Sequence, residues 1–326
     1  NFFEMGGHSI MAVNVMIKIE KITGVRIPLS ALFQHSTIEK FAKLLKIEDK
    51  IISEHLVPMK PNGSKNPLFI VHGAGLNVLN FAHLINHFDE DQPIYGFQGI
   101  GSNGYENWFE SIEAMASQYI KSIIKVNPNG PYALAGFSFG GIVAFEIARQ
   151  LKESGKTVST IVLLDTYLDS SYYYSSYSRK KAIRYLDRTY RRLDYLKEVL
   201  TSWKSLKLRL NSKKLYLQKK YFGLKDSMTE QEVIALKEFE EANAMVDKIV
   251  DRYHLIPQDF EVELFRAADD ENYKLDPVHL GWKKAALKGV NIHNIIGNHL
   301  NIVAPPNDKV LARMLQDILN KKHGNV

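Results

Sequence analysis

The chain has 326 residues, 45% of them hydrophobic, and its 42 Lys and Arg outnumber its 36 Asp and Glu, for a net charge of +6. This length is enough for one large domain with a small second one, and no stretch approaches the roughly 18 apolar residues that a membrane-spanning helix requires. The absence of cysteine excludes disulfides, thiolate metal sites and a cysteine nucleophile, and it favours a cytoplasmic protein.

Residues 1–46 predict a small all-helical unit. Its apolar residues recur at helical spacing, at Met11, Val15, Ile19 and Ile22. Ser9 is placed to cap the start of this helix, and Gly24 to end it. A connecting turn is expected over residues 28–33, and a second helix opens at Ser36 and Thr37. Because so few residues bury little core, we expect the unit to lack a preceding helix.

Residues 47–67 predict a linker, charged at first and then rich in Pro, Asn and Gly. After it the pattern changes to alternating strands and helices. Strands are expected at 68–71, 93–97, 132–135, 160–164, 261–265 and 290–296, and helices at 81–88, 111–126, 142–154 and 308–319. Together they predict a parallel α/β sheet, interrupted after residue 165 by a helical insertion.

The insertion concentrates positive charge. Residues 166–230 hold 16 Lys and Arg, 6 Asp and Glu, and ten of the 16 tyrosines. Basic and aromatic residues together can indicate a nucleic-acid surface. No recognition motif accompanies them here, so we expect solvated helices whose lysine stems lie along apolar surface, and no nucleic-acid partner.

A serine flanked by glycines lies between an expected strand and an expected helix. Gly136-Phe137-Ser138-Phe139-Gly140-Gly141 follows the apolar run 132–135 and precedes the apolar run 142–148. A strand, the pattern G-x-S-x-G and a helix together are typical of the nucleophile elbow, a sharp turn that lifts the serine hydroxyl clear of the sheet edge. Ser138 is therefore the predicted nucleophile.

A serine nucleophile needs a base to take its proton and an acid to orient that base. In enzymes with this elbow the acid and then the histidine follow the serine in the chain. Asp165 stands at the end of the strand 160–164, on the same sheet edge as the elbow. Asp269 and Asp270 follow a later strand and remain rivals, and an aspartate at any strand end can instead cap a turn.

His299 is the predicted base. It lies between the last expected strand and the last expected helix. His293 falls inside a strand, and neither His279 nor His254 follows a strand end.

The same chemistry needs two backbone donors for an oxyanion. We expect these donors to be the amide of Phe139, after the nucleophile, and that of Ala74, in the glycine-rich loop after the first buried strand.

The N-terminal segment presents a serine after two glycines. Ser9 follows Gly6 and Gly7 at the start of the first expected helix. From these residues alone Ser9 is either an N-cap or a hydroxyl presented for modification.

A resemblance to a known family decides between these two interpretations of Ser9, and a second resemblance covers the rest of the chain. Residues 1–10 resemble the attachment motif of peptidyl carrier domains, D-x-F-F-x-x-G-G-H/D-S-L/I, and the match extends through Phe33 and residues 37–38. This resemblance implies that Ser9 carries covalent 4′-phosphopantetheine. The rest of the chain resembles the type I thioesterase of nonribosomal peptide synthetases, at residues 56–60, 69–72, 95–98, 136–141 and 163–165. That family places its acid as Asp165 is placed, and its helical insertion is a lid.

The resemblance implies an organisation and an activity. It implies a partial carrier domain over 1–47, a linker and the start of the thioesterase over 48–66, and an α/β-hydrolase domain over 67–326 with a lid at about 166–250. The expected function is release of a carrier-bound peptidyl or acyl thioester through an acyl-serine, by hydrolysis or macrocyclisation. Upstream condensation and adenylation domains are the implied partners. A free-standing serine esterase or lipase and a non-catalytic docking module are the alternatives.

Overall fold

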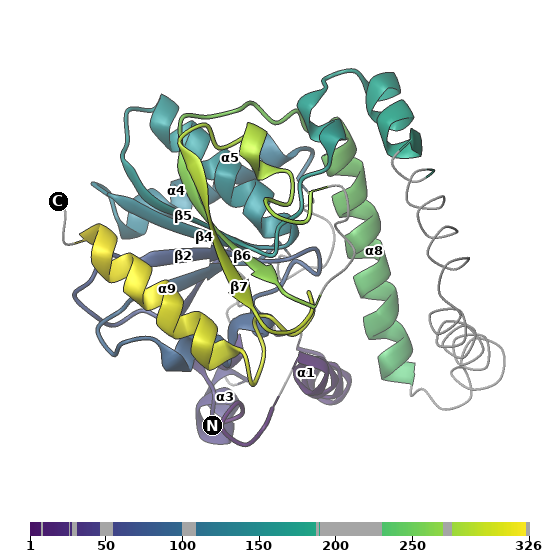
Figure 1. Cartoon of the computed structure of the whole chain (residues 1–326). Helices are drawn as coiled ribbons and strands as arrows, with labels where there is room; N and C mark the ends of the chain where they lie inside the picture. Colours follow the sequence, from purple (N-terminus) through teal and green to yellow (C-terminus); the bar gives the residue numbers. More distant parts are fainter. Residues whose placement is uncertain are drawn as a thin grey trace, which may run out of the picture.

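A computed structural model describes residues 1–7, 9–25, 27, 31–45, 55–99, 109–186, 189, 230–269 and 276–323. A twisted sheet with helices on both faces forms the larger part, and short helices near the N-terminus lie at one side of it (Figure 1). None of the helices in these described ranges is long and apolar enough to cross a membrane.

The sheet has the strand order β1-β3-β2-β4-β5-β6-β7. Its strands are β1 (Leu56–Lys60), β2 (Leu68–Val71), β3 (Ile94–Phe97), β4 (Tyr132–Phe137), β5 (Val158–Leu164), β6 (Glu261–Ala267) and β7 (Gly289–Ile295). β1 runs antiparallel to β3, and every other pair is parallel. The central strands β2 and β4 are buried along their whole length, as expected of strands covered on both faces. The mostly parallel sheet predicted from the sequence is confirmed.

Helices cover both faces of the sheet. On one face α4 (Ile112–Val126) and α5 (Phe139–Glu153) share an apolar cluster with α8 (Glu230–Arg252), which stands at the right of Figure 1. On the other face α9 (Asp308–His323) packs with two short 3₁₀ turns, η1 (Leu79–Phe81) and η2 (Leu84–His87). Two further 3₁₀ turns are η4 (Ser170–Tyr173) and η5 (Trp282–Lys284).

Three local predictions differ from the structure. The expected linker 47–67 contains the strand β1, which has only β3 as a neighbour in the sheet. An edge strand tolerates a proline that cannot donate to a partner, and Pro58 lies beside the β-bulge there. The expected helix 81–88 is two 3₁₀ turns, and the expected turn 28–33 ends in the short helix α2 (Ala31–Gln34). Residues 47–54 of the predicted linker lie outside the described residues.

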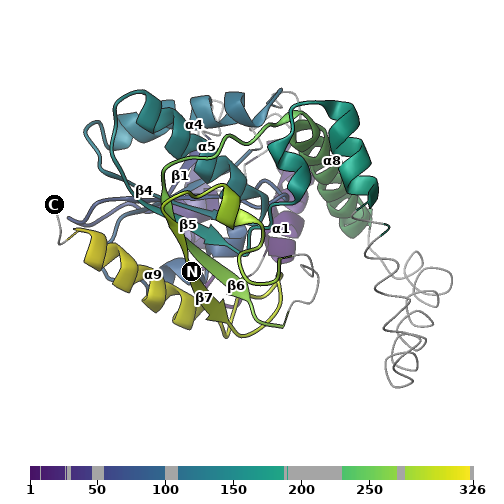
Figure 2. The same ribbon diagram turned by 45° about the horizontal axis from the view of Figure 1, so that its top comes forward.

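The N-terminal helices pack against the larger part of the chain. They are α1 (Ser9–Thr23), α2 and α3 (Ile38–Leu44), whose expected start is capped by the Thr37 hydroxyl. Phe3, Met16, Leu32 and Phe41 share one buried cluster with Leu79 and Ala82 from the η1 region. α1 also lies beside α8, and both views show this (Figure 1, Figure 2). The helical unit is therefore seated on the sheet domain through apolar contacts.

Only part of the predicted lid, at about 166–250, lies within the described residues. Residues 177–186 are helical, and α8 supplies the far end of the insertion. Lys180 ties the two segments together, because its buried Nζ donates to the backbone carbonyls of Asp251 and Tyr253. Residues 190–229, with most of the predicted positive charge, lie outside the described residues.

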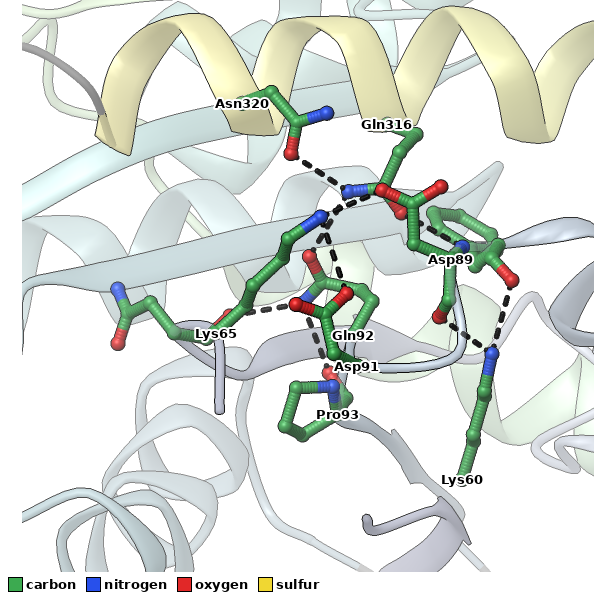
Figure 3. A network of polar contacts seen from close by, with 10 residues as sticks. Lys60, Lys65, Asp89, Asp91, Gln92, Pro93, Gln316 and Asn320 are labelled. Atoms are coloured by element: carbon green, nitrogen blue, oxygen red, sulfur yellow. Dashed lines mark hydrogen bonds and ion pairs between the residues drawn. The ribbon is translucent and has the colours of Figure 1, made fainter. Parts of the chain in front are cut away.

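A polar network closes the edge of the sheet where β2 and β3 begin (Figure 3). Lys65 pairs with Asp89 at 2.6 Å and with Asp91 at 3.2 Å. The Gln316 amide, on α9, donates to the buried Gln92 at 3.2 Å. These contacts join α9 to the loop before β3. The network lies at the edge of the sheet opposite to the one where the parallel strands end.

A buried carboxylate joins α5 to the end of α8. Glu146 is 1% exposed and accepts hydrogen bonds from Arg149, from Gln150 and from the Tyr253 hydroxyl at 2.9 Å. Burial, reinforced by this carboxylate, raises the pKa of Tyr253. The phenol therefore stays protonated and donates across the interface between the two helices.

We expect Tyr253→Phe to lower the free energy of unfolding by about 2 kcal/mol, because a hydrogen bond to a charged group is lost while the ring remains. Chemical denaturation monitored by circular dichroism measures the change. Tyr177→Phe is the matched control, since Tyr177 is 62% exposed. Equal stability of the two variants would show that the Glu146 contact stabilises nothing.

Candidate active site

Ser138 occupies a strained turn between β4 and α5. Its φ of +54° and ψ of −121° lie where few residues other than glycine are found. Its amide donates to the carbonyl of Leu164 at 2.9 Å, which ties the turn to β5. A Cβ on Gly136 would overlap the carbonyl oxygen of Gly140, and one on Gly140 would overlap that of His72. Glycine at both positions lets the strand reverse into the helix at Ser138.

The structure brings His299 beside this serine. His299 follows β7, and its Nε2 lies 3.0 Å from Ser138 Oγ. Its Nδ1 lies 2.7 Å from Asp165 Oδ2. The imidazole also stacks on the ring of Phe137, with centroids 5.0 Å apart and planes 21° apart. Phe137, which directly precedes Ser138 in the chain, therefore sets the plane of the His299 ring.

Asp165 is held at both carboxylate oxygens. It directly follows β5, is 1% exposed and has a φ of +46°. While Oδ2 faces His299, Oδ1 accepts the amide hydrogen of Ala267 at 2.8 Å. A carboxylate can only accept, so His299 Nδ1 carries a proton and its Nε2 is left to accept from the serine hydroxyl.

Asp269, the rival acid that the structure describes, does not join this chain of hydrogen bonds. Asp269 is exposed, and its amide donates to the carbonyl of Gly297. Asp270 lies outside the described residues.

The other three histidines considered in the sequence have different partners. His293 Nε2 lies 2.8 Å from Glu263 Oε2, inside the sheet at β6 and β7. His279 faces Asp276 at 3.5 Å, and His254 Nε2 lies 3.3 Å from a backbone carbonyl of η4. Of these four histidines, only His299 contacts Ser138.

The loop after β2 abuts the elbow. A Cβ on Gly73 would lie 3.1 Å from the Phe137 ring, and the His72 carbonyl is in close contact with Gly140. The amides of Ala74 and Phe139 donate to no group within the described ranges. Among the described residues, two N–H groups without a hydrogen-bond acceptor thus belong to the elbow and to the loop that contacts it.

His72 in this loop and Tyr119 on α4 had no predicted role. His72 is fully buried, with Nδ1 2.7 Å from the Gly73 carbonyl and Nε2 2.8 Å from the Tyr119 hydroxyl. Burial lowers the pKa of His72 to about 4. His72 could have been singled out because it directly follows a buried strand. No sequence signal pairs it with Tyr119, which is 47 positions away.

Ser9 is the first residue of the 15-residue helix α1, and no acidic residue lies in the first turn. A tight turn precedes it, in which the Gly6 amide donates to Phe3 and the Gly7 amide to Phe2. Gly6 has a φ of +85° and open space where a Cβ would stand. The backbone thus turns sharply just before the serine.

The arrangement around Ser138 can perform nucleophilic catalysis. A serine hydroxyl bonded to a neutral imidazole, which is bonded in turn to a carboxylate, can lose its proton as the oxygen attacks a carbonyl carbon. The amides of Ala74 and Phe139 can donate hydrogen bonds to the carbonyl oxygen as negative charge develops on it.

Comparisons with known proteins identify the families of the two parts of the chain. The thioesterase domain family matches residues 66–319, and the family of phosphopantetheine attachment sites matches residues 1–45. A dimodular nonribosomal peptide synthase of Bacillus subtilis is 39% identical over 167 residues, which are 51% of this chain and 7% of that protein. Malpinin synthetase of Mortierella alpina is 38% identical over 171 residues, which are 52% of this chain and 2% of that protein. The chain thus spans less than a tenth of the length of these two relatives.

A solved structure supports the fold over nearly the whole chain. A holo four-domain nonribosomal peptide synthetase bound to AMP and glycine superposes with a TM-score of 0.61 and 23% identity, over 98% of this chain and 24% of that one. The thioesterase match covers more than half of the residues. The chain therefore belongs to the thioesterase domain family and joins that domain to a phosphopantetheine attachment site, in the carrier–thioesterase arrangement of nonribosomal peptide synthetases.

Proposed function

We propose that this chain releases a peptidyl or acyl group from its own carrier domain, through an acyl ester on Ser138. The observation that carries the proposal is the hydrogen-bonded chain Ser138–His299–Asp165, with distances of 3.0 and 2.7 Å. It stands at a strained elbow in a thioesterase domain that follows an attachment site. The synthetase relatives support terminal release as the step performed.

In the first half-reaction Ser138 attacks the thioester carbonyl of the substrate. Its Oγ forms a bond to the carbonyl carbon as His299 Nε2 takes the hydroxyl proton. Asp165 holds the imidazole in the tautomer that can accept this proton and stabilises the imidazolium that forms. When the C–S bond breaks, His299 returns the proton to the departing sulfur, which leaves as a thiol.

The amides of Ala74 and Phe139 are the proposed oxyanion donors. Neither donates to a group in the described part of the chain, and backbone amides fixed before the reaction stabilise the tetrahedral intermediate without reorganising. In the second half-reaction His299 deprotonates either water or an amine or hydroxyl of the acyl chain itself as that group bonds to the carbonyl carbon. The ester bond to Ser138 Oγ then breaks, and His299 returns the proton to this oxygen. Water gives a free acid, and the internal nucleophile gives a ring.

Ser9 is the proposed attachment residue. Its position at the start of a 15-residue helix fits a phosphodiester, because the positive end of the helix dipole favours negative charge there. Phosphopantetheine supplies a thioester linkage on a long arm when bound. Packing of the carrier helices on the η1 region keeps Ser9 on the same body as Ser138, so the substrate is presented at high effective concentration. Upstream condensation and adenylation domains are the proposed partners.

Ser138→Ala is expected to lower turnover of a synthetic acyl-pantetheine thioester by at least about 10³-fold, because the nucleophile is gone. A fluorophosphonate probe should label the unmodified protein and not the variant, as read by intact-protein mass spectrometry. Ser154→Ala, at the end of α5, is the control and should retain both properties. Labelling that persists in folded Ser138→Ala would disprove this nucleophile.

Asp165→Asn is expected to lower kcat by about 10⁴-fold, because an amide facing His299 Nδ1 favours the wrong tautomer. Asp269→Asn serves as the matched change at the rival position and should leave kcat unaltered. Steady-state kinetics on the same thioester compare them. A larger loss in the Asp269 variant would move the acid to that position.

Ser9→Ala is expected to abolish release of an acyl group loaded on the carrier domain, while turnover of the free acyl-pantetheine thioester continues. Intact mass after incubation with coenzyme A and a phosphopantetheinyl transferase checks the loading, with Ser36→Ala as the control. A free-standing esterase would instead show equal turnover of its natural substrate in both variants. The mass of the product from a chain with an internal amine tells a ring, lighter by one water, from a free acid.

A further inference from the structure

We propose that His72, held by Tyr119, is a positioning residue that orients the Gly73–Ala74 peptide so that the Ala74 amide faces the oxyanion. This inference rests on the proposed function and adds two residues to its machinery. Neither residue touches Ser138, and both act through the backbone of the loop after β2.

The carbonyl of Gly73 is held from two sides. His72 Nδ1 lies 2.7 Å from it, and the amide of Leu76 donates to it at 3.0 Å. Leu76 is 1% exposed, has a φ of +57° and accepts the amide hydrogen of Gly99 at 2.8 Å. The turn from Gly73 to Leu76 therefore has little freedom to rotate.

Fixing this carbonyl fixes the proposed donor. The carbonyl of Gly73 and the amide of Ala74 belong to one peptide unit, which is planar and trans. In such a unit the N–H points opposite to the C=O. Since the carbonyl points at the His72 ring and at Leu76, the Ala74 N–H points away from them, and it donates to no group in the described part of the chain.

Tyr119 sets which nitrogen of His72 donates. A carbonyl oxygen can only accept, so Nδ1 carries the proton toward Gly73. In a neutral ring Nε2 must then accept, and the Tyr119 hydroxyl donates to it at 2.8 Å. Burial, with His55 as the neighbouring ionisable group, lowers the pKa of His72 to about 4, and burial raises that of Tyr119. Both groups are therefore neutral at physiological pH.

His72 also contacts Phe139, whose amide is the other proposed donor. Its ring stacks on that of Phe139, with centroids 6.2 Å apart and planes 28° apart. Its carbonyl is in close contact with Gly140, in the first turn of α5. One buried side chain thus contacts the Phe139 side chain and the Gly73–Ala74 peptide, whose amides would share one oxyanion.

The kinetic test compares three variants on an acyl-pantetheine thioester. His72→Leu removes the donor to Gly73 and should lower kcat by about 10²-fold. Tyr119→Phe leaves the ring in place but frees its tautomer, and should lower kcat by about 10-fold. KM should stay within about twofold in both, because the oxyanion contact forms only in the transition state. His72→Asn, whose side-chain amide can donate to Gly73, should recover part of the loss.

A tetrahedral adduct provides a second readout. Phenylboronic acid adds to Ser138 Oγ and places an oxygen where the oxyanion would form, so its dissociation constant should rise in His72→Leu and Tyr119→Phe. Binding of a thioether analogue of the substrate should not change. Tyr132→Phe is the matched control, because Tyr132 is equally buried and its hydroxyl donates to the Pro128 carbonyl at 3.2 Å. It should keep wild-type kcat and boronate affinity.

Three results would overturn the inference. Wild-type kcat and boronate affinity in folded His72→Leu and Tyr119→Phe, with turnover lost in Ser138→Ala, would remove these two residues and leave the proposed function intact. An equal loss of kcat in Tyr132→Phe would show that any buried phenol has the same effect. Undiminished turnover in Ser138→Ala would overturn the proposed function and this inference with it.

Discussion

The close approach of the α5 N-terminus to the loop after β2 is the contact on which the site depends. Gly136 and Gly140 have no Cβ at positions where one would overlap a neighbouring carbonyl oxygen. That space lets β4 turn directly into α5, with Ser138 at a φ of +54°. A strained conformation of this kind persists only where its surroundings impose it. Here the Ser138 amide is bonded to Leu164, and the loop of His72 and Gly73 lies against the turn.

The parallel sheet brings the remaining groups to the same place. β4, β5 and β7 all end at one edge, so the residues that follow them meet although they are 134 and 161 positions apart along the chain. At the opposite edge the network around Lys65 and Gln92 joins the loop before β3 to α9 (Figure 3). This network and the candidate site thus lie at opposite ends of the strands. The N-terminal helices add a third element, since they are seated on η1 and beside α8.

Local patterns predicted most elements and missed those that depend on distant partners. The mostly parallel sheet, the helix over 111–126 and the start of α3 at Thr37 followed from periodicity and capping residues. β1 was assigned to a linker, because Pro58 disfavours a strand unless that strand lies at a sheet edge. The segment 81–88 has helical composition, yet it forms 3₁₀ turns where it packs between the sheet and the N-terminal helices.

The sequence by itself determined which chemistry to propose for this chain. The glycine spacing around Ser138 and Ser9 and the order of Ser138, Asp165 and His299 are local or ordinal properties, so a reader of the chain can find them. Strand-end position left both Asp165 and Asp269 open, and the resemblance favoured Asp165. The tertiary structure places the Asp165 carboxylate 2.7 Å from His299, because packing sets the distance of each carboxylate from the imidazole. It also paired His72 with Tyr119. A hydrogen bond between a loop and a helix depends on how α4 lies on the sheet, which no short stretch of residues encodes.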